Sequence, residues 1–282
     1  RAGHRAGPFQ CDTALVRREI YTHSHHKVVV DSHGSRTADE AAAFVRHLIT
    51  PDMRILDAVS GPGSITCGLA EWVPQGEVIG IDSAESIVAH ARRRAMDLGV
   101  DNVAFEVGDV YELRFTAGSV DDVYAHQLLQ HLAEPVEALR EFMSLLKPGG
   151  VVAVRDADYG TMTHFPHEVG IDRFFEIYSQ VAKANGGEPD AGRRLLSWVN
   201  SAGFRDAELT TSSWTYATPA SRAHWADLWS GRTGVSKYVE RVEELGVSDR
   251  AELAELGTLF QEWASSPDAV FAFLHGEVVA RA

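Results

Sequence analysis

The sequence predicts an α/β protein with a doubly wound, mostly parallel sheet. Three observations favour this fold class. Short β-branched runs alternate with amphipathic helical stretches over residues 54–155. Glycine or aspartate follows several of these runs, at the places where a strand would turn toward a helix. No internal repeat or low-complexity linker interrupts the pattern, so a single domain is expected over residues 1–282.

The core elements are expected to alternate between strand and helix. The strands are residues 54–59, 77–81, 102–107, 119–124 and 151–155, and the helices are residues 64–72, 84–98 and 134–146. The second helix has Glu85 in its first turn and ends at Gly99, as the helix dipole and the stop preference of glycine favour. The third helix has Pro135 in its first turn. Five strands within about a hundred residues indicate βαβ units.

Further elements surround this core. A helix is expected over residues 37–49, before the first strand. Helices over residues 171–184 and 190–202 follow the fifth strand, and then a sixth strand over residues 204–217. Three helical stretches within residues 219–265 and a last strand over residues 270–282 complete the chain.

Composition and charge limit the functions that are open to the chain. It is 45% hydrophobic and 23% charged, as expected of a chain that buries a core. The formal net charge of −14 argues against nucleic acid as a partner and favours small molecules. No apolar run reaches the roughly 18–20 residues that span a bilayer, and residues 1–10 do not resemble a secretory signal. Two cysteines fit a cytoplasmic location. A homo-oligomer stays open.

Four polar or glycine-rich segments follow successive strands of the predicted sheet. The first runs from Asp57 to Gly63 and contains Gly61, where backbone N–H groups can approach a ligand. Asp82 ends the second strand, 19 residues after Gly63, where a carboxylate can accept both hydroxyls of a ribose. Asp109 follows the third strand and can accept from an adenine amino group. Because these segments share one edge of a parallel sheet, they predict a nucleotide-type site.

Each segment also has a purely structural interpretation. The glycine loop can be a tight strand-to-helix turn, and Asp82 can cap the following helix. The fourth segment, residues 125–131, contains His126, Gln127 and His131 directly after the fourth strand. The coincidence of four placements at one sheet edge is more specific than any single one of them.

These stretches (ILDAVSGPGSIT, VIGID, FEVGDV, SVDDVYAHQLLQHL and LREFMSLLKPGG) resemble the class I S-adenosylmethionine-dependent methyltransferases. The likeness is greatest to the ubiquinone- and menaquinone-biosynthesis type. It implies a seven-stranded Rossmann-like sheet with helical lid additions, S-adenosylmethionine as cofactor and methyl transfer to a small molecule. The residues that it implies for the cofactor are Tyr21, Asp57, Ser60, Gly61, Gly63, Asp82, Ser83, Asp109, Val110 and Gln127. By the same likeness, residues 1–50 form a lid, residues 51–158 bind the cofactor, and residues 159–203 and 218–268 face the substrate.

One position departs from the family pattern. The family usually has a Gly-Cys-Gly-like triplet where this chain has Val59-Ser60-Gly61, and valine is poorly suited to positive φ. Either the loop keeps Val59 extended, or cofactor binding is weakened. A binding protein without catalysis and a cofactor-dependent cyclase are the alternatives to methyl transfer. A nicotinamide site is disfavoured because Thr66 replaces the glycine or alanine that its fingerprint requires.

The remaining candidates concern catalysis and the acceptor. Histidine is the natural general base near neutral pH, and the candidates for this role are His126, His131 and His25. The acceptor is expected to contact Arg155, Tyr159, Arg193 and Trp229. No metal site is expected, because His23, His25 and His26 have no carboxylate or cysteine beside them.

Overall fold

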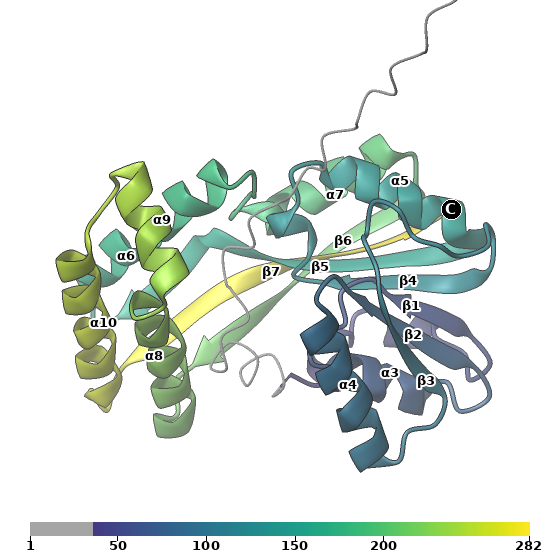
Figure 1. Ribbon diagram of the computed structural model, residues 1–282, viewed down its shortest axis with the longest axis horizontal. Coiled ribbons are helices and arrows are strands. Elements are labelled where there is room, and N and C mark those ends of the chain that lie inside the picture. The colour runs from purple at the N-terminus through teal and green to yellow at the C-terminus, as the bar shows by residue number, and fades with distance from the viewer. Residues whose placement is uncertain (1–35) are drawn as a thin grey trace, which may run out of the picture.

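A seven-stranded sheet runs through the computed structural model, which describes residues 36–282 (Figure 1). The strand order is β3-β2-β1-β4-β5-β7-β6. The strands are β1 (Arg54–Asp57), β2 (Glu77–Asp82), β3 (Val103–Val107), β4 (Val120–His126), β5 (Leu146–Phe165), β6 (Arg205–Tyr216) and β7 (Val270–Arg281). The first five in this order are parallel, and β7 is antiparallel to both β5 and β6. The predicted doubly wound, mostly parallel sheet is confirmed.

The helices cover the two faces of the parallel sheet. Helices α3 (Ser64–Trp72) and α4 (Glu85–Leu98) lie below the sheet in Figure 1, and α5 (Pro135–Leu145) and α7 (Leu195–Ala202) lie above it. Adjacent residues of a strand face opposite sides. Ile55 accordingly packs in the cluster that contains Leu69 of α3, whereas Leu56 packs in the cluster that contains Phe142 of α5.

A second layer of helices gathers around the far end of β5 and β7. It comprises α6 (Val169–Ala184), α8 (Pro219–Thr233), α9 (Ser236–Leu245) and α10 (Arg250–Ser265), at the left of Figure 1. These helices share a separate aromatic core with the strand ends, in which Phe174, Trp229, Phe260 and Phe271 are fully buried. Among residues 36–282, no helix combines the length and the apolar character that a bilayer span requires.

Three predicted elements are corrected. The fifth strand is not residues 151–155 but Leu146–Phe165, because β7 pairs with it as far as Phe165. The helix expected over residues 190–202 begins as a 3-10 turn, Ala191–Arg194, before α7. The helix expected over residues 37–49 divides into α2 (Ala38–Ala41) and the 3-10 turn Arg46–Leu48.

Tyr124 gives a physical reason for the break in residues 37–49. Its hydroxyl donates to the carbonyl oxygen of Ala41 at 2.8 Å, the oxygen that Val45 N–H would use in a continuous helix. Val45 N–H instead donates to the Ala42 carbonyl at 3.1 Å. A hydrogen bond from a buried strand residue therefore outweighs the local helical pattern.

Candidate cofactor and acceptor site

A cavity of about 990 Å³ opens at the carboxyl ends of the parallel strands, where the strand order reverses at β1. One part, the core half, is formed by the segments after β1, β2 and β3. It is lined by Ser60, Gly61, Asp82, Ser83, Asp109 and Val110. The other part, the outer half, is formed by β6, α8 and the middle of β5. It is lined by Tyr159, Trp214, Tyr216, Trp225, Trp229 and Arg232. The segment after β4 lies between the two halves.

The two glycines of the first loop have different surroundings. Both have positive φ, 50° at Gly61 and 82° at Gly63. A Cβ on Gly63 would lie 3.0 Å from Ala91 Cβ and from Phe105 Cζ, so Gly63 is needed for packing against α4 and β3. A Cβ on Gly61 would meet no protein atom within 4 Å, and Gly61 lines the cavity. Gly61 therefore leaves space that a ligand can fill, as its predicted role requires.

Val59 does not take up positive φ. Among the non-glycine residues that the structure describes, only Gln127 and Asp206 do so. Val59 is partly buried against the core cluster of α5, and it also lines the cavity. The loop thus accommodates valine without backbone strain of the kind that positive φ would cause.

The carboxylates after β2 and β3 both line the core half. Asp82 is 8% exposed, and its Oδ1 accepts from Ala84 N–H at 2.9 Å. The residue at the N-cap of α4 is Ala84, so Asp82 supports the turn before the helix and does not cap it. Asp109 Oδ1 accepts from Tyr111 N–H at 2.9 Å, which fixes the turn after β3. Each carboxylate is therefore oriented by the backbone two residues further on.

Asp57 lies behind the glycine loop and is not among the residues that line the cavity. It is 1% exposed, and Thr66 Oγ1 donates to its Oδ2 at 2.7 Å. Burial raises the pKa of Asp57 to about 7, although the hydrogen bond from Thr66 opposes this. Neither Asp57 nor Gly63 lines the cavity, so the prediction that they contact the cofactor directly is corrected. Both residues instead support the glycine loop from behind.

The segment after β4 is held against β7. Gln127 has a φ of 51°, which is uncommon for a residue with a side chain and marks a constrained position. Its Nε2 lies 2.9 Å from Nε2 of His275 on β7. Burial, and then the charge of Arg155, hold the pKa of His275 well below its usual range. A neutral His275 thus orients the Gln127 side chain at the junction of the two halves.

Two of the three predicted catalytic histidines line the cavity. His126 is 5% exposed, and its ring centroid lies 5.9 Å from that of Trp214. Burial lowers the pKa of His131 to about 3, and the charges of Arg232 and Arg36 act in the same direction. His131 is therefore neutral at physiological pH. His25, like Tyr21 of the cofactor set, lies outside the described residues.

Arg155 is fully buried at the boundary of the two halves. Its Nε donates to Glu277 Oε1 at 2.9 Å, and its Nη2 donates to Ser212 Oγ at 3.0 Å. Its guanidinium also lies 4.8 Å from the ring centroid of Trp214. Arg155 does line the cavity as predicted, but the Glu277 carboxylate already balances its charge.

The other predicted acceptor residues separate into two groups. Tyr159 and Trp229 line the outer half, and Tyr159 stacks on Tyr178 with centroids 4.9 Å apart. Arg193 does not reach the cavity, because its Nε donates to Asp158 Oδ2 at 2.7 Å and the pair closes the turn before α7. The predicted contact between Arg193 and an acceptor is corrected accordingly.

Sequence reasoning missed Arg232, Tyr216 and His275. Arg232 and Tyr216 line the cavity through the packing of α8 and the pairing of β6 with β7, and His275 contacts Gln127, which lines it. No local pattern in the sequence predicts the pairing of β6 with β7 or the packing of α8. The alternation of β6 predicts that one side of the strand faces inward, but it does not say which element that side meets.

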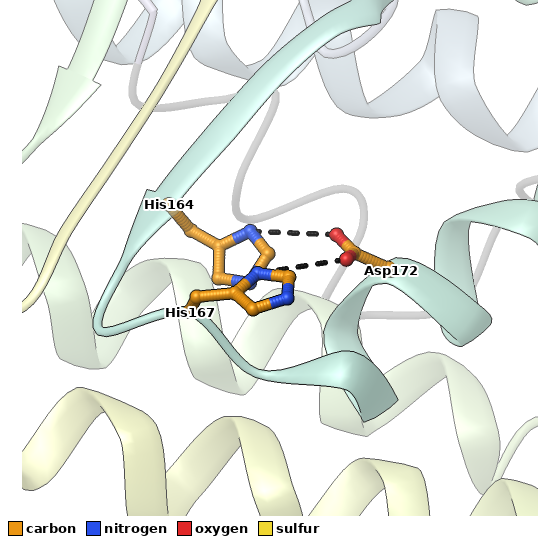
Figure 2. A group of neighbouring side chains, drawn as sticks. All are labelled: His164, His167 and Asp172. Carbon is orange, nitrogen blue, oxygen red and sulfur yellow. Dashed lines mark ion pairs between the residues drawn. The ribbon is translucent and has the colours of Figure 1, made fainter.

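A separate cluster of His164, His167 and Asp172 closes the turn between β5 and α6 (Figure 2). Asp172 lies 3.8 Å from Nδ1 of His164 and 3.6 Å from Nδ1 of His167. Nε2 of His164 accepts from Glu168 N–H at 2.9 Å at the start of α6. The ligand atoms are within 4.8 Å of one another, but none of the three residues lines the cavity. These contacts tie the end of β5 to the first turn of α6.

Fold and site together describe a doubly wound sheet with a cavity at its strand ends, the place where such folds bind nucleotide-type ligands. The sequence model of the methyltransferase domain matches residues 49–203, which is more than half of the chain. The chain therefore belongs to the methyltransferase domain family. It is a methyltransferase, and its cofactor is S-adenosylmethionine.

Relatives and solved structures agree with this assignment. A methyltransferase of Schizosaccharomyces pombe is 28% identical over 267 residues, 92% of this chain and 95% of its own length. A demethylmenaquinone methyltransferase of Bacillus cytotoxicus is 30% identical over 123 residues, 40% of this chain and 52% of its own length. The predicted resemblance to the menaquinone type is thus confirmed.

Two solved structures share the fold. The YcgJ protein of Bacillus subtilis has a TM-score of 0.57 at 16% identity, covering 86% of this chain and 97% of its own. The cyclase SpnF has a TM-score of 0.51 at 21% identity, covering 90% of this chain and 79% of its own.

Proposed function

We propose that this methyltransferase acts on a small-molecule acceptor that is bound in the outer half of the cavity. The observation that carries the proposal is the continuity of the cavity. A single space joins Gly61 and Asp82 at the strand ends to the aromatic wall of Tyr159, Trp225 and Trp229. Its volume of about 990 Å³ lies in the range of small-molecule sites.

The residues of the core half fit the cofactor by their chemistry. The buried Asp82 carboxylate is a hydrogen-bond acceptor suited to ribose hydroxyls, and Asp109 is suited to an adenine amino group. Gly61 leaves space beside the backbone, as the glycine loop of such a site must. In this proposal residues 51–158 hold the cofactor, and residues 159–203 and 218–268, together with β6, hold the acceptor.

S-adenosylmethionine supplies a methyl group that is already activated by the positive sulfur. The protein therefore needs to hold a nucleophile in line with the methyl group and to exclude water. The buried aromatic wall of the outer half suits both tasks. Because the pKa of His131 is about 3, this histidine is a weak base and suits orientation of the acceptor. His126 is the candidate for accepting a proton from the acceptor.

The Asp82→Ala variant tests the cofactor half of this proposal. A hydrogen bond to a charged group contributes about 1.5–3 kcal/mol, so losing the carboxylate should raise the Kd for S-adenosylhomocysteine about 10- to 100-fold. Isothermal titration calorimetry measures this directly. Asp82→Asn keeps an oxygen that can accept from Ala84 N–H but removes the charge. Comparing the two variants therefore separates the effect of losing the turn from the effect of losing the charge. Asp97→Ala, on the exposed face of α4, is the control. Unchanged affinity in Asp82→Ala would remove the main support for the site.

The acceptor half is tested by transfer of a labelled methyl group to components of a cell extract. Products of low molecular mass are expected. Labelling that is confined to protein or nucleic acid would contradict the proposal.

A further inference from the structure

Helix α8 carries two buried arginines that differ in whether the protein provides hydrogen-bond acceptors for them. Arg222 is 5% exposed, and its guanidinium donates to the carbonyl oxygens of Ala217 at 2.6 Å and Ala264 at 3.3 Å. Arg232 is 6% exposed, but its Nε and Nη1 are buried without any hydrogen bond to the described residues. Nor does a carboxylate of residues 36–282 form an ion pair with it. Backbone carbonyl oxygens therefore accept hydrogen bonds from Arg222, whereas Nε and Nη1 of Arg232 have no acceptor among the described residues.

The aromatic side chains around Arg232 do not supply the missing counter-charge. The Arg232 guanidinium lies 4.0 Å from the ring centroid of Trp229 and 5.9 Å from that of Tyr178. Such cation–π contacts orient the group, but they do not replace hydrogen-bond acceptors for its N–H groups. A buried charge without a partner is unfavourable, so natural proteins rarely leave one without a function.

The outer half offers further donors and no acid. Nε1 of Trp225 and Nε1 of Trp229 are also buried without a partner among the described residues. The carboxylates that line the cavity are Glu40, Asp82 and Asp109, all from α2 or from the segments after β2 and β3. From His126 to the end of the chain, the lining residues include no aspartate or glutamate. The wall around Arg232 thus presents positive charge, indole N–H groups and aromatic faces.

We propose that Arg232 binds a carboxylate of the methyl acceptor, and that the acceptor is a small aromatic or partly apolar acid. This inference rests on the proposed function for the identity of the bound molecule as the acceptor. Arg232 lies in the last turn of α8, where the helix dipole is negative. A singly charged carboxylate is therefore favoured over a phosphate dianion, which that dipole would repel more strongly. Tyr159 and Tyr216 provide the flat faces on which the apolar part stacks.

The neutral state of His131 agrees with this arrangement. Burial is the main cause of the low pKa of His131, and the charge of Arg232 acts in the same direction. A neutral His131 adds no second cation to the wall and leaves Arg232 as the group that attracts an anion.

The test compares binding of benzoate and its neutral isostere benzamide to the full chain, saturated with S-adenosylhomocysteine. Quenching of tryptophan fluorescence and calorimetry give the two dissociation constants. The wild type is expected to bind benzoate at least tenfold more tightly than benzamide. Arg232→Met should lose this preference, and Arg232→Lys should keep part of it. Arg250→Met, an exposed arginine at the start of α10, should bind like the wild type.

Three outcomes would overturn the inference. They are equal binding of benzoate and benzamide to the wild type, an undiminished preference in Arg232→Met, and tighter binding of phenyl phosphate than of benzoate. Circular dichroism and affinity for S-adenosylhomocysteine show whether each variant is folded. If Arg232→Met does not fold, the wild-type preference and Arg232→Lys decide the question.

The labelled products separate this inference from the proposed function. Small methylated products that an anion exchanger does not retain would refute the inference that the acceptor is an acid, but they would still support methyl transfer to a small molecule. An acid-binding cavity in a protein that labels no small molecule would refute the proposed function and leave the Arg232 site intact.

Discussion

Replacing Asp122 by asparagine should make the protein more stable, and increasingly so as the pH rises. Asp122 lies in the middle of β4 and is 1% exposed. Neither of its carboxylate oxygens has a hydrogen-bond partner among the described residues. Burial, and to a smaller extent the charge of Asp121, raise its pKa from 3.8 to about 8. In the folded protein this side chain is therefore a neutral acid at pH 7.

The sign of the effect follows from the two pKa values. Below about pH 4 the folded and unfolded states both hold the proton, and Asp122 costs no stability through ionisation. Between pH 4 and pH 8 only the unfolded state releases it, so each pH unit costs the folded state up to about 1.4 kcal/mol. From pH 5 to pH 8 the cost reaches a ceiling of about 4 kcal/mol. Asparagine has nearly the same shape and cannot ionise, so Asp122→Asn should recover much of this loss.

Urea unfolding, followed by tryptophan fluorescence at pH 5, 6, 7 and 8, measures the effect. The stability of the variant relative to the wild type should grow with pH, by about 2–4 kcal/mol across this range. Asp97→Asn, an exposed position, should give no such trend. Asp57 and Asp156, whose pKa values burial raises to about 7, stay in both proteins and contribute a common slope. A stability difference that is the same at pH 5 and pH 8 would refute the reasoning.

Three further substitutions separate packing from ligand contact in the glycine loop. Gly63→Ala should lower stability by about 1–3 kcal/mol, because positive φ and the contacts with Ala91 and Phe105 both oppose a methyl group; a thermal melt reports it. Gly61→Ala should lose less stability, because only its positive φ opposes the methyl group, but it should bind S-adenosylhomocysteine at least tenfold more weakly, since that methyl group would enter the cavity; equal losses of stability in the two variants would contradict this. Val59→Gly should gain up to about tenfold in calorimetric affinity, because the valine side chain lines the cavity beside Gly61; an unchanged affinity would show this expectation to be wrong.

The core half of the site could be predicted because its geometry is local. The turn after a parallel strand must lie at the carboxyl edge of the sheet, so the positions of Asp82 and Asp109 follow from the strands alone. Gly61 follows in the same way from the turn after β1. No knowledge of distant contacts is needed for any of these placements.

The outer half could not be predicted because distant residues decide it. Arg155 was expected to contact an acceptor, but Glu277, 122 residues further along the chain, balances its charge. Asp158 similarly engages Arg193 and keeps it out of the cavity. Arg232 looks like an ordinary charged residue at the end of a helix in the sequence. Its significance depends on the absence of a counter-charge among the described residues, which only the packing of α8 against β5 and β7 reveals.

The length of β5 has a consequence for the kinds of acceptor that the fold can accommodate. Strand β5 carries Arg155 beside the cofactor loops and, four residues further on, Tyr159 beside the helical layer, where its pairing with β7 becomes irregular. Four residues of strand extend about 13 Å. The strand therefore sets the distance between the reacting centre and the aromatic wall. A longer or shorter acceptor would therefore require a different position of α8, or of the aromatic residues along β5.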